Sequence, residues 1–328
     1  MKSIAIVILN WNGKKLLEEF LPFVVNYSPE ATIYVADNAS GDDSVNFLQE
    51  YYPDVTIISN KKNYGYAGGY NKALKEVEED IYVLLNSDVE VTEGWLSPII
   101  SLFEKDTQTA IIQPKILDYY RRDHFEYAGA AGGFIDKYGF PYCRGRIFNT
   151  IERDNGQYGN TEIFWASGAC FFIRKEVFWK LGGFDDDFFA HQEEIDLCWR
   201  AFNSNYKVRF CADSVIYHVG GATLKNSSSH KTFLNFRNSL WMLLKNLPTN
   251  QLFPVLFIRL TLDGIAGWRF LAKGKFSHFF AIMKSHFYFY LKLFYFLNKR
   301  QSNQYKKYYK NRSIVARYFA LNGKIFGK

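Results

Sequence analysis

One run of five apolar residues, 81–85, constrains the fold of this chain more than any other stretch. It mixes β-branched and aromatic side chains and stops abruptly at Asn86-Ser87-Asp88. A short, wholly apolar run of this kind is typical of a strand buried on both faces of a sheet. Ligands of open α/β sheets bind at the carboxyl ends of the strands, so Asp88 is placed to meet one. A polar turn that merely ends the strand explains the same residues about equally well.

Strands and helices alternate through the amino-terminal part of the chain. Apolar runs predict strands at 4–9, 32–36, 55–58 and 81–85, with helices between them near 14–26, 44–51 and 68–77. This β-α-β order predicts a parallel, doubly wound sheet. Because a polar residue follows each strand, one rim of the sheet is expected to carry Asn10, Asp37, Asn63 and Asp88.

A glycine-rich loop, residues 63–71, follows the third strand. Its glycines would let backbone amides approach a diphosphate, and the helix that begins near Gly68 offers its positive end to an anion. The loop lacks the G-x-G-x-x-G spacing and does not follow the first strand, so a dinucleotide cofactor is the weaker interpretation. Glycines chosen only for tight helix packing are the simpler alternative.

Further along, two acidic residues stand at the start of an expected helix. Apolar residues with helical spacing begin at Ile195, which places Glu193 and Glu194 in the first turn. The helix dipole favours an ionised acid there, and an ionised acid can accept a proton. Acids also occur at this position simply as caps, so the helix start by itself leaves both interpretations open.

Three other features of the second half of the chain point to a ligand-binding site. Residues 115–159 show little periodicity and are expected to form acceptor-facing loops. Small residues before an apolar run at 164–174 predict a strand that lets a ligand approach. Strands expected at 207–210 and 214–217 lead to His218, which is a candidate metal ligand alongside Asp88, although a lone histidine is more often structural.

The net charge of +7 hides two unlike parts. Residues 264–328 contain fourteen Lys/Arg and no Asp/Glu, whereas the rest of the chain has 26 Lys/Arg against 33 Asp/Glu. A basic tail on an acidic body predicts that the tail meets an anionic surface. The four cysteines show no CxxC or zinc spacing, which fits buried thiols in a reducing compartment.

Taken together, the ordered motifs resemble family 2 glycosyltransferases of the inverting GT-A type, and most closely their rhamnosyltransferase-like branch, over roughly residues 3–240. The resemblance implies an α/β GT-A fold, Rossmann-like with a mostly parallel sheet, and a helical, basic C-terminal extension. We therefore expect a catalytic domain at 1–231 and a membrane-associating region at 232–328. The donor-binding residues that the resemblance implies are Asn10, Asn12, Asp37, Asn63, Gly65, Ala67, Gly68, Asn71, Asn86, Ser87 and Asp88.

The resemblance also implies the catalytic roles. Asn86-Ser87-Asp88 stands where the family has D-x-D; its first acid is absent, which leaves Asp88, with His218, to hold Mg²⁺ or Mn²⁺. The run from Glu193 to Arg200 stands where the branch usually has Glu-Asp-x-Asp-Leu-Cys-x-Arg, which makes Glu194 the implied base, with Glu193 or Asp196 able to substitute. The implied acceptor-binding residues are Trp165, Gly168, Glu193 and Asp196.

The implied activity is inverting transfer from a nucleotide-diphosphate sugar, dTDP-rhamnose or a UDP-sugar, to a lipid-linked or polysaccharide acceptor. A non-catalytic nucleotide- or glycan-binding module on the same fold is the main alternative, because the first metal-binding acid is missing. A nucleotidyltransferase is a weaker one, because Asn10-Trp11-Asn12-Gly13 is a poor basic, glycine-rich loop.

The C-terminal runs 252–268 and 276–297 contain interrupting charges. We expect them to lie in the plane of an anionic leaflet, as a peripheral protein at the cytoplasmic face of a bacterial inner membrane. A spanning helix at 276–297 and docking of 232–268 onto the catalytic domain are the alternatives. A nucleic-acid partner is disfavoured because the aromatic residues cluster with Leu and Ile.

Overall fold

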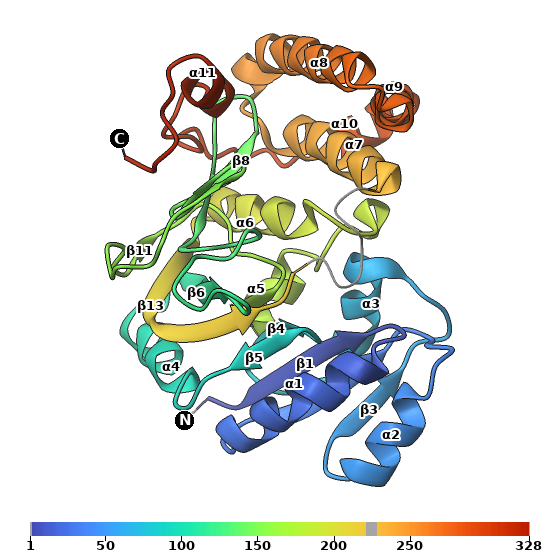
Figure 1. The fold of residues 1–328 in the computed structure, drawn as a ribbon, viewed down its shortest axis with the longest axis vertical. Coiled ribbons are helices and arrows are strands. Elements are labelled where there is room, and N and C mark those ends of the chain that lie inside the picture. Colours follow the sequence, from blue (N-terminus) through green and yellow to red (C-terminus); the bar gives the residue numbers. More distant parts are fainter. Residues whose placement is uncertain (1, 221–227, 328) are drawn as a thin grey trace.

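The computed structural model describes residues 2–220 and 228–327, and its centre is a mixed sheet (Figure 1). The strands follow the order β11-β13-β6-β12-β4-β1-β2-β3, with β5 paired to β13. Parallel pairing joins β1 (Ile4–Asn10) to both β2 (Thr32–Asp37) and β4 (Ile81–Asn86), and β2 to β3 (Thr56–Ser59). The prediction that the first four strands form a parallel sheet is therefore confirmed.

Helices cover both faces of this sheet because its strands are apolar on both sides. Ile6 of β1 faces a core formed with α1 (Lys14–Tyr27), α2 (Ser44–Tyr51) and α4 (Leu96–Lys105). Val7 points the other way, into a core shared with α3 (Gly65–Ala73), α5 (Lys175–Lys180) and α6 (Glu193–Asn203). A short 3₁₀ turn, η1 (Leu74–Glu76), follows α3.

The second half of the sheet differs from the sequence prediction in three strands. The remaining members are β5 (Val89–Val91), β6 (Thr109–Asp118), β11 (Thr161–Glu162), β12 (Cys170–Arg174) and β13 (Lys207–His218). Strand β12 runs antiparallel to β4 and is shorter than the predicted 164–174. The two strands expected at 207–210 and 214–217 are one strand, β13, whose register shifts between Cys211 and Val215. The polar residues at this irregularity made the strand look interrupted.

The expectation that residues 115–159 are irregular was wrong. Strand β6 continues to Asp118, and a second, four-stranded antiparallel sheet follows, made of β7 (Gly133–Ile135), β8 (Pro141–Cys143), β9 (Arg146–Ile147) and β10 (Thr150–Ile151). Strands of two or three residues are too short to display an alternating pattern, so the sequence carried no signal for them.

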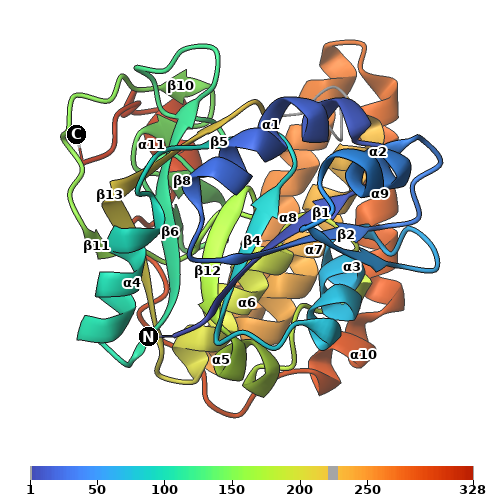
Figure 2. The same cartoon turned by 90° about the horizontal axis from the view of Figure 1, so that it is seen from below.

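The C-terminal helices form a layer at the end of the molecule far from α2 (Figure 1). They are α7 (Ser229–Asn246), α8 (Thr249–Ala272), α9 (Phe276–Leu291), α10 (Leu293–Asn298) and α11 (Ile314–Phe319). Seen from below, α7 and α8 lie behind β1 and β2 (Figure 2), and α9 contacts both α7 and α8. The expected single run 276–297 breaks at Lys292. Within the described residues, no helix combines the length and apolar character needed to cross a bilayer.

The C-terminal region shares its hydrophobic core with the rest of the chain. Tyr308 stacks on Trp199 of α6, with ring centroids 4.9 Å apart. Ile314 is fully buried, and its amide donates to the Asp136 carboxylate at 2.8 Å. The division predicted near residue 231 falls close to the start of α7, but the chain on its two sides packs as one body.

Candidate active site

The ends of β1 and β2 form one wall of the candidate site. Asn10 and Asp37 are register partners, and the Asn10 amide donates to the Asp37 carboxylate and to the Ser40 hydroxyl, each at 3.2 Å. Asn12 adopts a left-handed backbone (φ 52°), and its side-chain oxygen accepts the Gly41 amide at 2.7 Å. These bonds fix the two strand-end turns against each other, as the parallel order predicts.

The glycine-rich loop makes contacts within the protein that the sequence did not predict. The Asn63 side chain accepts the Gly65 amide at 2.8 Å, and Gly65, with φ 73°, starts α3 three residues earlier than expected. The next two amides, of Tyr66 and Ala67, both donate to the carbonyl of Phe189, at 2.7 and 3.2 Å. These two amides are therefore already satisfied within the protein, and the diphosphate contact of the loop stays a prediction.

The other residues of this loop also pack against the chain around Phe184. The side-chain amide of Asn71 donates to the Phe184 carbonyl at 2.8 Å, and its side-chain oxygen accepts the Phe184 backbone amide at 2.9 Å. Ala67 and Gly68 are buried. Helix α3 thus supports the chain at Phe184 and Phe189, and the donor contacts of Gly65, Ala67, Gly68 and Asn71 stay predictions.

Asp88 and His218 meet at the centre of the rim, although 130 residues separate them in the chain. Asp88 lies just after β4 and His218 ends β13, and β13 pairs with β5 so that His218 is opposite Val89. The Oδ1 of Asp88 lies 3.2 Å from Nε2 of His218. On the other side of the ring, Nδ1 lies 3.4 Å from Oε1 of Glu126. All three side chains are buried.

This buried trio is electrostatically coupled. Burial alone would lower the pKa of His218, but the Asp88 and Glu126 carboxylates outweigh it and raise the pKa to about 10. Burial likewise acts to raise the pKa of Asp88, and the His218 charge instead brings it below its usual range. Neither ring nitrogen has an aligned hydrogen bond. Without a metal, the ring thus carries a positive charge between two carboxylates, and a cation bound at Nε2 would take the place of that proton.

A divalent cation fits the Asp88 and His218 pair. Two ligands that each lie ~2.1 Å from one cation are roughly 3 Å apart, close to the separation observed here. No group of three or more His, Cys, Asp or Glu residues suited to a metal occurs in the part of the chain that the structure describes. The protein would therefore supply two ligands. Glu126, which sequence reasoning missed because its segment shows no pattern, would orient the histidine ring.

A strained loop leads into the second wall of the site. Phe189, His191 and Gln192 all have positive φ, at 63°, 71° and 74°, and a conformation of this kind costs about 1–3 kcal/mol per residue. Helix α7 holds the loop in place: the Asn238 amide donates to the carbonyls of Phe188 and Ala190 at 2.9 Å and of His191 at 2.7 Å. Such strain is typical of functional sites.

The strained loop ends at Glu193 and Glu194, which begin α6. Burial, followed by the charge of Glu194, raises the pKa of Glu193 well above its usual range. Burial raises the pKa of Glu194 to about 7. Glu193 is only 3% exposed, whereas Glu194 is partly exposed. Two adjacent buried carboxyls do not ionise together, so the more accessible Glu194 is the one that can carry a charge near neutral pH.

Polar atoms without partners gather at these two walls. Among the described residues, thirteen buried side-chain atoms lack a hydrogen bond, and seven of them belong to Asn10, to His218 and to residues 191–194. Buried polar atoms are nearly always paired, so a cluster of unpaired ones indicates where a polar ligand is accommodated. Tyr66 lies beside the second wall: its hydroxyl donates to the Gly168 carbonyl at 2.8 Å, and Glu193 and Glu194 help to raise its pKa after burial and Tyr70.

Two of the predicted acceptor residues have structural roles instead. The Trp165 ring is buried against Gly133, and its indole N–H donates to the Phe134 carbonyl at 2.9 Å. Asp196 is fully buried and accepts hydrogen bonds from Arg200, Lys245 and Asn246. Neither side chain is accessible to an acceptor. Asn86 and Ser87 are partly exposed at the β4 exit, where they stay predicted donor contacts.

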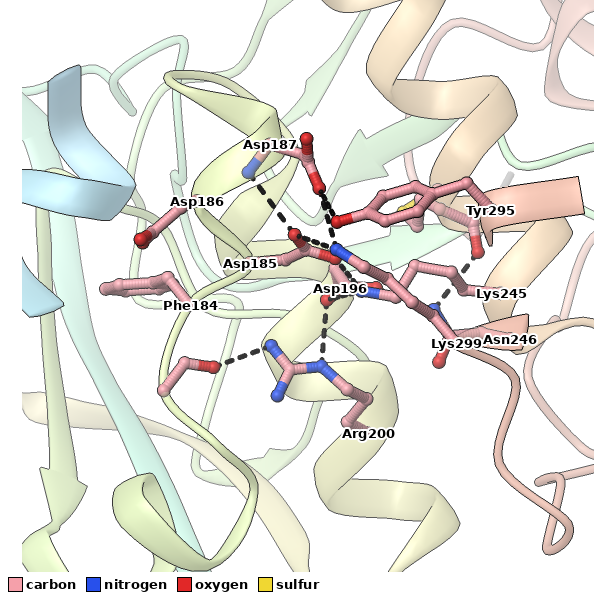
Figure 3. A network of polar contacts seen from close by, with 12 residues as sticks. Phe184, Asp185, Asp186, Asp187, Asp196, Arg200, Lys245, Asn246, Tyr295 and Lys299 are labelled. Carbon is pink, nitrogen blue, oxygen red and sulfur yellow. Dashed lines mark hydrogen bonds and ion pairs between the residues drawn. The ribbon is translucent and has the colours of Figure 1, made fainter. Parts of the chain in front are cut away.

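Asp196 belongs to a network that ties the strained loop and the start of α6 to the C-terminal helices (Figure 3). Lys245 of α7 lies 2.9 Å from Asp196 and 2.7 Å from Asp185. Asp187, in the 3₁₀ turn η2 (Asp186–Phe188), pairs with Lys292 and Lys299, each at 2.7 Å. A recess of about 700 Å³ borders this network, and the charged side chains that line it are largely paired with one another.

Comparison with known proteins identifies the class to which this fold and site belong. The family Glycosyl transferase family 2 matches residues 4–182. The chain is 25% identical to the low-salt glycan biosynthesis hexosyltransferase Agl10 of Haloferax volcanii over 244 residues, 73% of this chain and 74% of the relative. It is 22% identical to the N-acetylglucosaminyl-diphospho-decaprenol L-rhamnosyltransferase of Mycobacterium tuberculosis, over 72% of this chain and 85% of the relative.

Solved structures agree on the fold. The mannosyltransferase PcManGT from Pyrobaculum calidifontis, in complex with GDP-Man and Mn²⁺, superposes with a TM-score of 0.54 at 14% identity, covering 90% of this chain and 87% of that one. The chain therefore belongs to glycosyl transferase family 2 and has the GT-A fold. It is a rhamnosyltransferase-like glycosyltransferase, as the sequence predicted.

Proposed function

We propose that this protein is an inverting, metal-dependent glycosyltransferase that builds a cell-surface glycan. It would move a sugar from a nucleotide-diphosphate donor, dTDP-rhamnose or a UDP-sugar, to a hydroxyl of a lipid-linked or polysaccharide acceptor. The relatives named as rhamnosyltransferase and glycan hexosyltransferase support this choice. The observation that carries the proposal is that the site has two walls. The strand ends, with Asp88 and His218 among them, form one wall, and the strained loop that ends at Glu194 forms the other.

In this proposal Glu194 takes the proton from the acceptor hydroxyl as its oxygen bonds to the anomeric carbon of the sugar. The bond to the diphosphate breaks on the opposite face, so one displacement inverts the configuration. Asp88 and His218 would hold Mg²⁺ or Mn²⁺, which offsets the charge that develops on the leaving diphosphate. Glu193, kept protonated by burial, fills the space beside the base without competing for the proton.

Donor binding tests the first wall. With Mn²⁺ and a donor at ~100 times its Kd, we expect about 2.7 kcal/mol of stabilisation and a measurable rise in melting temperature. A panel of dTDP-, UDP- and GDP-sugars would identify the donor. Asp88→Asn should remove the metal-dependent part of the rise, whereas Asp213→Asn, at an exposed position of β13, should keep it. Full Mn²⁺-dependent stabilisation of Asp88→Asn would contradict the metal site.

The pH dependence of transfer tests the second wall. Only the ionised form of Glu194 accepts a proton, and burial raises its pKa to about 7. The rate should therefore rise with pH between about 6 and 8, well above the range in which an exposed glutamate titrates. Initial rates at saturating donor and metal provide the measurement. A rate that is constant across this interval would argue against a buried carboxyl as the base.

A further inference from the structure

Helices α8, α9 and α10 leave a row of large apolar side chains in solvent. We define the aromatic face as the exposed residues of this row, which are Phe253, Phe257, Ile265, Trp268, Phe276, Phe280, Met283, Phe287, Tyr290, Leu291 and Phe294. Their exposed fractions range from 54% to 80%. Soluble proteins rarely expose this much contiguous apolar surface without a partner.

The spacing of these residues gives each helix one outward stripe. On α8, Phe253, Phe257 and Ile265 recur at intervals of four or eight, and on α9 the exposed positions recur at three and four. The opposite side of each helix is buried: Val255 and Arg259 of α8 and Ile282 of α9 face the protein. Each helix is therefore apolar on two sides: the inner side packs against the protein, and the outer stripe is left in solvent.

The exposed charges that α8 and α9 themselves carry beside the aromatic face are of one sign. Residues 214–328 contain nineteen Lys/Arg and a single acid, Asp263. Asp263 is fully buried and pairs with Arg259 at 2.8 Å, so it contributes no negative charge to the surface. Arg269, Lys273 and Lys275 are exposed in and beside the turn that joins α8 to α9, and Lys284 is exposed midway along α9. These two helices thus combine exposed apolar side chains with exposed positive charge.

We propose that the aromatic face binds an anionic lipid leaflet, with α8 and α9 lying in the plane of the membrane surface. The apolar stripes enter the boundary of the acyl chains, and the basic residues meet the phosphate headgroups. A second copy of this chain is a poorer occupant, because a two-fold contact would bring like charges together. The inference does not depend on the transfer reaction, and vesicle binding reads it out directly.

The experiment uses the full-length chain and sedimentation with vesicles. We expect binding to phosphatidylglycerol vesicles, weaker binding to phosphatidylcholine vesicles, and loss of the difference at high salt. The double variant Phe257→Ser/Phe287→Ser should bind at least ~10-fold more weakly. Tyr51→Ser is the matched control: Tyr51 is 63% exposed, but it lies on α2 at the other end of the molecule, so its loss should change nothing.

Two further measurements keep the proposal falsifiable. Lys273→Glu/Lys275→Glu should reduce binding to phosphatidylglycerol by roughly thirtyfold and leave binding to phosphatidylcholine unaffected. Brominated lipids should quench the fluorescence of Trp268, which is 66% exposed, so Trp268→Phe should lose most of the quenching and Trp11→Phe should retain it. Absence of vesicle binding, or self-association through the face in its place, would overturn the proposal.

Discussion

Glu194→Gln is expected to lower the rate of sugar transfer by about 10²–10⁴-fold, the usual contribution of a general base. Glutamine keeps the shape of the side chain but cannot accept the acceptor's proton. Because the carboxyl is buried and its pKa lies near 7, losing its charge should leave the fold intact. Transfer is measured with saturating donor and metal, and donor binding by calorimetry, where the variant should match the parent protein.

Glu193→Gln is the matched control for this result. Its carboxyl is the immediate neighbour and is more deeply buried, and burial raises its pKa well above the normal range. Burial thus favours its uncharged form, so the substitution should reduce the rate far less. A Glu194→Gln protein with full activity, or a Glu193→Gln protein with the larger loss, would assign the base to a different residue.

Asp196→Ala is expected to destabilise the fold by about 3–5 kcal/mol, the range for breaking a buried ion pair by removing one partner. The substitution leaves Lys245 and Arg200 buried with one counter-charge fewer, and it removes the acceptor of the Asn246 amide. Because these contacts join α6 to α7, the strained loop that precedes α6 should lose its support as well. Thermal or urea unfolding measures the effect.

The control for this prediction is Asp43→Ala, which removes an exposed ion pair with Lys14 and should barely change the unfolding midpoint.

The pH dependence of stability offers a second check on the role of Asp196. Burial would raise the pKa of Asp196, but Lys245 and Arg200 outweigh it and lower the pKa to about 2. An acid with a depressed folded pKa stabilises the protein above its unfolded pKa of 3.8, and this stability is lost as the pH falls from there toward 2. Equal stability of Asp196→Ala and the parent protein would contradict the role of the network.

The candidate site shows where prediction from sequence succeeded and where it failed. The pairing of Asn10 with Asp37 follows from strand order, because polar residues at the ends of parallel strands share one edge. Asp88 and His218 follow strands that end at this edge, and the antiparallel pairing of β5 with β13 brings them together. The bonds of the glycine-rich loop could not be predicted, because its amides donate to Phe189, a partner more than a hundred residues away. Trp165 and Asp196 were predicted to bind the acceptor, but both side chains are buried. The position of a residue in a motif does not reveal whether it is buried.

The sequence by itself determined the order of the first strands, the identity of the side chains at their ends and the basic character of the tail, because these depend on local pattern and composition. Only the tertiary structure decided that Glu126 stands behind His218, that Asn238 supports a strained loop and that the C-terminal helices hold that loop through buried ion pairs. Each of these depends on contacts between residues far apart in the chain. The energy of such contacts depends on burial and geometry that no local pattern encodes.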